Sequence, residues 1–145
     1  MFAIVRERID LERISEATRN ASCGAVTAFA GIVRAQADDG RPVIGLSYEA
    51  YDLMAIRTFE EIADEARATF GPCEISIVHR VGDLDVGEIA VAVVVASAHR
   101  AAAFDACEYA IDAVKARAPI WKRERYADGE EFWKDNACGQ GTPAP

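Results

Sequence analysis

The segment from Ile89 to Ala96 is the longest unbroken apolar run in the sequence, and it limits the possible folds more than any other feature. The run is far shorter than the roughly 20 residues that a helix needs to cross a bilayer. A short apolar run of this kind is typical of a strand whose two faces are both covered. We therefore expect residues 88–96 to form the central strand of a sheet.

Strand and helix patterns alternate on both sides of this run. Strands are expected at residues 2–6, 24–34, 42–51, 74–81 and 120–126. Helices are expected after three residues that can act as caps, Asp10, Asp52 and Ser97, and a short helical turn is expected at 130–134. This order, β-α-β-β-α-β-β-α-β, predicts an α+β fold with a mainly antiparallel sheet and three helices.

Three local features complete the expected fold. An Asp-Gly turn signal in the polar loop after Arg34 predicts a hairpin between strands 24–34 and 42–51. Residues 82–87 are expected to form a turn. The apolar stripe of the third helix is expected to contain Phe104, Cys107, Ile111 and Val114.

Length and composition exclude several classes of protein. The 145 residues suit one domain, expected at residues 1–136 with a flexible tail at 137–145. A net charge of −8 excludes a general nucleic-acid binder, which needs a basic surface. The four scattered cysteines include no Cys-x-x-Cys pair, which argues against a zinc site or a redox dithiol. Without a signal peptide or membrane span, we expect a cytoplasmic protein with free thiols.

One segment, residues 115–126, concentrates positive charge on this acidic chain. It holds five basic residues and one acidic residue, a net charge of +4. Such a segment suits a small anion or an acidic peptide. The alternative is a charged edge strand that prevents aggregation, with Lys115 paired along its helix. Lys115 and Lys122 are the best catalytic candidates, since a lysine among other cations can become a usable base or nucleophile.

His99 and Arg100 are expected in the first turn of the third helix, where the helix dipole favours negative groups. A bound phosphate would resolve this conflict, because a helix N-terminus, an arginine fork and a histidine all bind anions. The alternative is that both side chains point into water. Arg34, at the end of a strand, is a third possible anion contact, whereas Phe29 and His79 are better explained as structural residues.

Several motifs together resemble the catalytic (large) subunit family of molybdopterin synthase. The most specific are VASAHRAAAF at residues 95–104 and DAVKARAPIWKRE at 112–124. FAGIVR at 29–34, LSYEAYDLMA at 46–55 and VHRVGDLDVGE at 78–88 match in the same order. The resemblance covers residues 24–134 and implies an α/β-hammerhead-like domain.

The resemblance implies a sulfurtransferase of molybdenum cofactor biosynthesis that has no cofactor or metal of its own. In this family, cyclic pyranopterin monophosphate (precursor Z) becomes molybdopterin by gaining two sulfurs. The donor is the C-terminal glycine thiocarboxylate of a separate, small ubiquitin-like subunit. Two large subunits form a homodimer with one small subunit at each end, as a heterotetramer.

By matching motifs, the resemblance also assigns roles to six residues. It implies that Lys115 is the principal catalytic lysine and Lys122 the second. It implies substrate-binding roles for four further residues, namely Arg34, His99, Arg100 and Phe29.

Two alternatives to this function remain open from the sequence. One is a non-catalytic α+β module that binds an anionic metabolite or an acidic peptide tail. The other is an enzyme with Cys107 as nucleophile, which the expected apolar position of this thiol disfavours.

Overall fold

The computed structural model describes residues 1–134. The tail expected at 137–145, and the domain boundary at 136, lie outside the described residues. In chain order the elements are β1 (Phe2–Val5), α1 (Leu11–Thr18), β2 (Ala25–Ile32), β3 (Val43–Ala50), α2 (Asp52–Phe70), β4 (Cys73–Arg80), β5 (Gly82–Asp85), β6 (Ile89–Ser97), α3 (Arg100–Arg117), β7 (Ile120–Tyr126) and β8 (Glu131–Lys134). The α+β class with three helices is confirmed.

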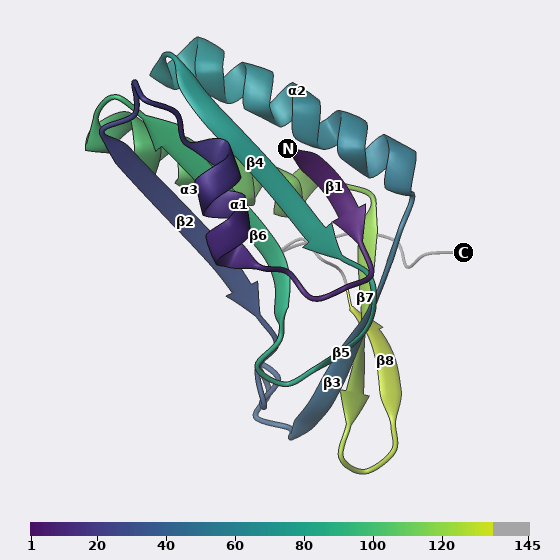
Figure 1. The fold of residues 1–145 in the computed structure, drawn as a ribbon. Helices are drawn as coiled ribbons and strands as arrows, with labels where there is room; N and C mark the ends of the chain where they lie inside the picture. Colours follow the sequence, from purple (N-terminus) through teal and green to yellow (C-terminus); the bar gives the residue numbers. More distant parts are fainter. Residues whose placement is uncertain (135–145) are drawn as a thin grey trace.

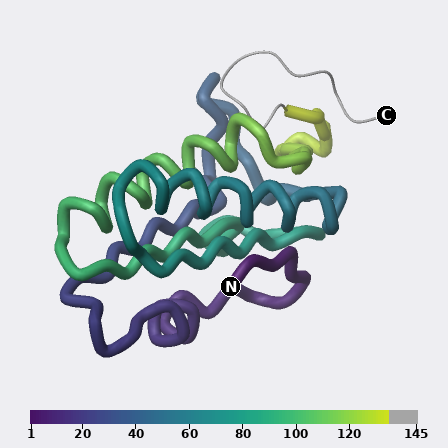
Figure 2. Tube along the Cα trace, turned by 90° about the horizontal axis from the view of Figure 1, so that it is seen from above, coloured from purple at the N-terminus to yellow at the C-terminus, as the bar shows by residue number. Residues whose placement is uncertain are grey.

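The first sheet has the strand order β1-β4-β6-β2, and helices cover both of its faces. Figure 2 shows α1 on one face and the longer α2 and α3 on the other. As expected, β6 lies inside the sheet, where it pairs antiparallel with β2 and β4. Val93 and Val95 pack into the core beneath α2 and α3, whereas Ala92 and Val94 pack beneath α1. The apolar run is therefore uninterrupted because both of its faces are buried.

The second sheet, β5-β3-β7-β8, is entirely antiparallel and extends from one end of the first (Figure 1). The expected hairpin between residues 24–34 and 42–51 is wrong, because β2 and β3 belong to different sheets. The chain leaves the first sheet at a register shift between Gly31 and Ile32. Val33 then becomes buried and donates its backbone N–H to Glu88.

Two further expectations for the second sheet are wrong. Residues 82–85 form β5 rather than part of a turn, since they pair with β3. Residues 131–134 form β8 rather than helix, because they pair with β7. In that pairing Arg123 faces Trp133 and forms an ion pair with Glu131. Cross-strand partners distant in sequence thus decide the conformation of both segments.

The helix ends confirm one expected cap and correct two. Asp10 caps α1, its side chain accepting a hydrogen bond from the Arg13 backbone N–H. Tyr51, rather than Asp52, occupies the N-cap position of α2, with no side-chain cap bond. His99 occupies that of α3, while Ser97 remains in β6 and donates its hydroxyl to the His99 carbonyl.

The buried face of α3 differs from the expected stripe at Phe104. Cys107, Ile111 and Val114 are buried as predicted, but Phe104 is 61% exposed. Three buried alanines, Ala103, Ala106 and Ala110, also face the core. Their small side chains let the helix approach the sheet closely and leave the phenyl ring outside. No helix of the described residues is long and apolar enough to cross a membrane.

Candidate active site

A pocket of about 430 Å³ lies where the two sheets and the C-terminal half of α3 meet. This volume is in the range of small-molecule sites. Eight of its seventeen lining residues are polar or charged, and the others are apolar side chains and Gly31. The lining residues are contributed by β2, the segment after it, β3, β4, β6, α3 and β7, so the site depends on the whole fold.

Four of the six sequence-predicted site residues line this one pocket: Phe29, Arg34, Lys115 and Lys122. They come from β2, the segment that follows it, the last turn of α3 and β7. Within residues 1–134 neither lysine forms an ion pair with a carboxylate. The pairing of Lys115 along its helix, offered as an alternative from the sequence, is therefore not observed there.

Arg34 differs from the lysines because it has a counter-ion. Its Nη2 atom lies 2.8 Å from Oδ1 of Asp38, which also lines the pocket. The hydrogen bond from Arg34 lowers the pKa of Asp38, and the charge of Lys122 lowers it further. Both partners are exposed, so an incoming anion can compete with Asp38 for the guanidinium.

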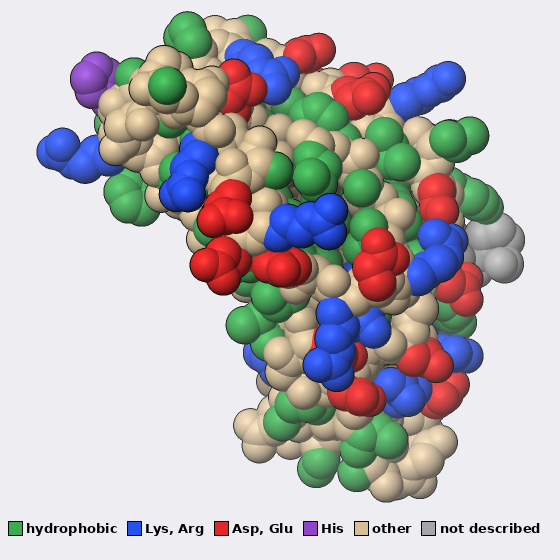
Figure 3. All heavy atoms as spheres, in the orientation of Figure 1, with side chains coloured by type: hydrophobic (Ala, Val, Ile, Leu, Met, Phe, Trp, Pro, Cys, Tyr) green, Lys and Arg blue, Asp and Glu red, His purple; other side chains and the backbone are tan. Residues whose placement is uncertain are grey.

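The basic segment 115–126 does not form one patch. Side chains alternate along β7, so Lys122 and Glu124 face the pocket, whereas Arg123 and Arg125 face away from it. Arg117 turns to α2, where its Nη1 atom lies 2.6 Å from Oε2 of Glu65. On the face drawn in Figure 3, basic and acidic side chains are interspersed in the same way. Only two of the five cations therefore serve the pocket.

His99 and Arg100 are exposed at the start of α3 and do not line the pocket. Because a helix rises about 1.5 Å per residue, Arg100 lies about 22 Å along α3 from Lys115. Within one copy of the chain, these two residues therefore lie far from the four predicted site residues that line the pocket.

Sequence reasoning did not predict three buried polar residues as part of the site, although they line the pocket: Tyr48, His79 and Glu124. All three are buried, and Glu124 accepts a hydrogen bond from the hydroxyl of Tyr126. In the register of the second sheet, Tyr48 is directly opposite Lys122. The alternation of β3 could have indicated an inward Tyr48, but the position of His79 depends on the packing of two sheets.

Burial controls the charge of two of these groups. It lowers the pKa of His79 to about 4, so the imidazole is neutral near pH 7. Burial, followed by the nearby charge of Glu124, raises the pKa of Tyr48 to about 12, so this phenol keeps its proton. The pocket thus combines these two neutral groups with the cations of Arg34, Lys115 and Lys122. Two acidic residues, Asp38 and Glu124, also line it.

Gly31 leaves room in the pocket wall. A Cβ atom built at this position would lie 2.7 Å from Cγ1 of Val91 and 3.5 Å from Cε1 of Phe29. All three residues line the pocket, so any larger side chain at Gly31 would displace its neighbours or fill the cavity.

Comparison with known proteins identifies the family. A family model described as "MoaE protein" matches residues 4–117. The chain is also 43% identical over 141 residues to the molybdopterin synthase catalytic subunit of Nostoc sp., an alignment that covers 96% of this chain and 85% of that protein. The chain belongs to the MoaE family. It is an enzyme of molybdenum cofactor biosynthesis, as its motifs predicted.

Solved structures of MoaE relatives have the same fold. Molybdopterin synthase from Staphylococcus aureus gives a TM-score of 0.87 at 41% identity, covering 92% of this chain and 96% of that one. A chain from the complex of subunits 1 and 2 of molybdopterin-converting factor from Helicobacter pylori gives a TM-score of 0.74 at 25% identity, covering 90% and 88%.

The cysteine alternative finds no support in this MoaE fold. Cys107 is 3% exposed, and burial raises the pKa of its thiol to about 11. A thiol in this environment is protonated near pH 7 and therefore a poor nucleophile. Within residues 1–134, no group of three or more His, Cys, Asp or Glu side chains is arranged to hold a metal ion.

Proposed function

We propose that this chain transfers two sulfurs to cyclic pyranopterin monophosphate, giving the dithiolene of molybdopterin. Each sulfur comes from the C-terminal glycine thiocarboxylate of a separate small subunit, whose tail is left as an ordinary carboxylate. The convergence of Arg34, Lys115 and Lys122 on one pocket carries the proposal. Both reactants are anionic, and charge-assisted hydrogen bonds from these cations suit a phosphate and a thiocarboxylate. The Helicobacter pylori relative was solved as a complex of two subunits, which supports a separate sulfur carrier.

In this proposal the two lysines act on the acyl group of the sulfur donor. Lys115 assists proton transfer or activates the thiocarboxylate carbonyl. Lys122, beside Tyr48 in the second sheet, stabilises the negative charge that develops during acyl transfer. The absence of ion pairs to either amine within residues 1–134 leaves both available for these roles. Arg34 releases Asp38 and binds an anionic group of the substrate in its place, and Phe29 lines the pocket wall.

His99 and Arg100 remain substrate-binding residues in the proposal, but they act on a second copy of the chain. The separation along α3 prevents them from reaching the pocket of their own protomer. In a homodimer, flanked by small subunits in a heterotetramer, the start of one α3 can approach the pocket of the partner. Arg100 then shares with Lys122 the stabilisation of developing charge.

Mixed dimers test this arrangement. Arg100→Ala and Lys115→Ala homodimers are each expected to be inactive, whereas a mixed dimer of the two contains one pocket with both native residues. We expect this mixed dimer to recover up to half of the wild-type activity. A mixed dimer as inactive as its parents would reject the sharing of the site between protomers.

Reconstitution tests the proposed reaction itself. Purified protein is mixed with the thiocarboxylated small subunit and cyclic pyranopterin monophosphate, and molybdopterin is measured by fluorescence after oxidation. The matched control is the same small subunit ending in an ordinary carboxylate, which has no sulfur to give. Product from the thiocarboxylate alone supports the proposal. A complex that forms without product would instead indicate a binding module. We place the reaction in the cytoplasm, where the thiols stay reduced.

A further inference from the structure

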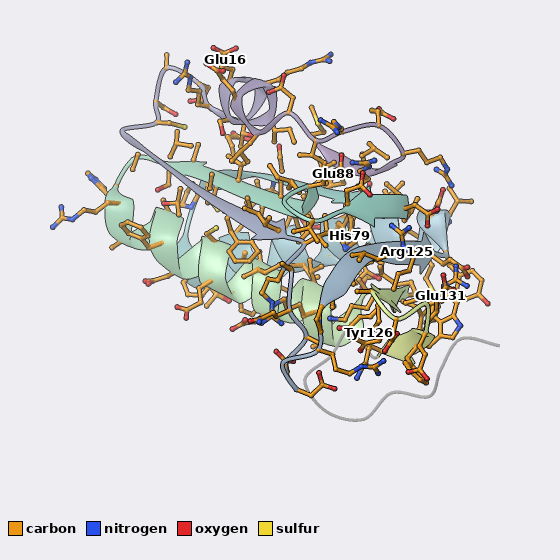
Figure 4. The ribbon with its side chains drawn as sticks, turned by 90° about the horizontal axis from the view of Figure 1, so that it is seen from below. Glu16, His79, Glu88, Arg125, Tyr126 and Glu131 are labelled. Carbon is orange, nitrogen blue, oxygen red and sulfur yellow. The ribbon has the colours of Figure 1, made fainter. Side chains whose placement is uncertain are left out.

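Tyr48 and His79 form a pair of buried polar side chains inside the pocket. Tyr48 lies on β3 of the second sheet and His79 on β4 of the first, and their ring centroids are 4.9 Å apart at an interplanar angle of 68°. Only 8% of Tyr48 and 3% of His79 are exposed, and both line the pocket. Figure 4 shows His79 in the interior, well away from Glu16 on the outer helix. The two sheets therefore meet at this pair.

The hydrogen bond of His79 determines which ring nitrogen carries the proton. Its Nδ1 atom lies 2.8 Å from the Arg80 carbonyl oxygen, which can only accept a hydrogen bond. Nδ1 is therefore the protonated nitrogen, and Nε2 has a free lone pair in the neutral ring. Within residues 1–134, the hydrogen bond of the ring is the one at Nδ1, and Nε2 forms none. His79 thus offers the pocket an acceptor.

Tyr48 offers the complementary group. Its phenol is protonated near pH 7, and its hydroxyl forms no hydrogen bond within the described part of the chain. Neither polar atom is among the fully enclosed, unpartnered side-chain atoms of the described residues, so both are accessible from the cavity, where a ligand can hydrogen-bond to them. The register of β3 and β7 places this pair next to Lys122.

We propose that Tyr48 and His79 form a neutral polar subsite that binds an amide group of the ligand. The Tyr48 hydroxyl donates to the amide carbonyl oxygen, and His79 Nε2 accepts from an amide N–H. The cations around the pocket bind the anionic groups, and this pair orients the neutral part of the ligand.

This inference rests on the proposed function, because both of its reactants carry an amide. One is the lactam edge of the pterin ring, and the other is the final peptide bond of the small subunit's tail. The shared chemistry is an N–H donor beside a carbonyl acceptor.

Titration calorimetry with three probes distinguishes the two sources. The probes are cyclic pyranopterin monophosphate, a synthetic peptide with the small subunit's tail sequence, and inorganic phosphate. Tyr48→Phe removes only the hydroxyl. His79→Asn can keep the hydrogen bond to Arg80 but lacks the Nε2 acceptor, and His79→Gln returns an acceptor near that position. Tyr109→Phe is the matched control, because the Tyr109 hydroxyl donates to Glu65 outside the pocket.

We expect Tyr48→Phe and His79→Asn each to weaken the binding of one amide-bearing probe roughly tenfold, the effect of one lost hydrogen bond. Inorganic phosphate should bind unchanged, and His79→Gln should recover part of the loss. A loss for the pterin alone assigns the subsite to the lactam, and a loss for the peptide alone assigns it to the tail.

Unchanged affinity of both amide-bearing probes for folded Tyr48→Phe would overturn the proposal, as would an equal loss for inorganic phosphate. Tyr48→Phe keeps this test decisive even if the His79 variants do not fold. The proposed function fails in a different way: the wild type then forms no molybdopterin, whereas the variants still bind the amide-bearing probes more weakly than the wild type does.

Discussion

Mild acid should destabilise this protein through His79, because the folded chain holds its imidazole neutral. The pKa of this group falls from 6.5 to about 4 on folding, mainly through burial. Between these values the unfolded chain binds a proton that the folded chain does not, so stability falls as pH falls. At about 1.4 kcal/mol per pH unit, the loss is about 2 kcal/mol at pH 5 and about 3 kcal/mol once pH is below the folded pKa.

Urea unfolding of the wild type and of His79→Asn at pH 7.5 and pH 5.0 measures this effect. Carboxylates titrate in both proteins, so their contribution cancels in the comparison. We expect the wild type to lose about 2 kcal/mol more than the variant on acidification. His99→Asn removes the exposed imidazole instead and should behave as the wild type does. Equal losses for the wild type and His79→Asn would refute a neutral, buried His79.

Three further substitutions test the pocket. Gly31→Val should strongly reduce molybdopterin formation, because its Cβ would lie 2.7 Å from Val91, while overpacking costs about 1–3 kcal/mol in the free energy of unfolding; normal activity would contradict the geometry of the wall. Cys107→Ala should keep most of the activity, and complete inactivation of the folded variant would restore the cysteine mechanism. Asp38→Asn removes the counter-ion of Arg34 and should therefore lower KM for the anionic substrate. The decrease should be smaller than about fivefold, because the ion pair is exposed. A raised KM would show that Asp38 assists binding.

Much of the fold could be predicted from local patterns. The uninterrupted run of β6 predicts its central place, because burial on both faces removes the polar alternation. The cap at Asp10 depends only on residues within one helical turn. The expected hairpin failed for the opposite reason: a turn signal cannot show that β2 and β3 join different sheets. The helical turn expected at 130–134 is wrong because the pairing of β8 with β7 is a tertiary interaction that local patterns do not show.

The candidate site, too, could be predicted only in part from the sequence. Lys115, Lys122, Arg34 and Phe29 were found through motifs, and the structure brings them to one pocket. The sequence favours a structural role for His79, because a histidine within a strand has no distinctive functional signal. Its importance follows from the junction of two sheets, the Arg80 carbonyl beside Nδ1 and the Tyr48 ring, none of which is encoded by local spacing.

The most direct test of the central claim is the rate of molybdopterin formation by Lys115→Ala, with small-subunit binding measured on the same sample. Arg57→Ala is the control, because Arg57 is an exposed cation on α2 that does not line the pocket. We predict a loss of at least 100-fold for Lys115→Ala, the range of acid–base and oxyanion contributions, with binding and fold retained. A normal rate would show that sulfur transfer does not depend on the lysine of this pocket.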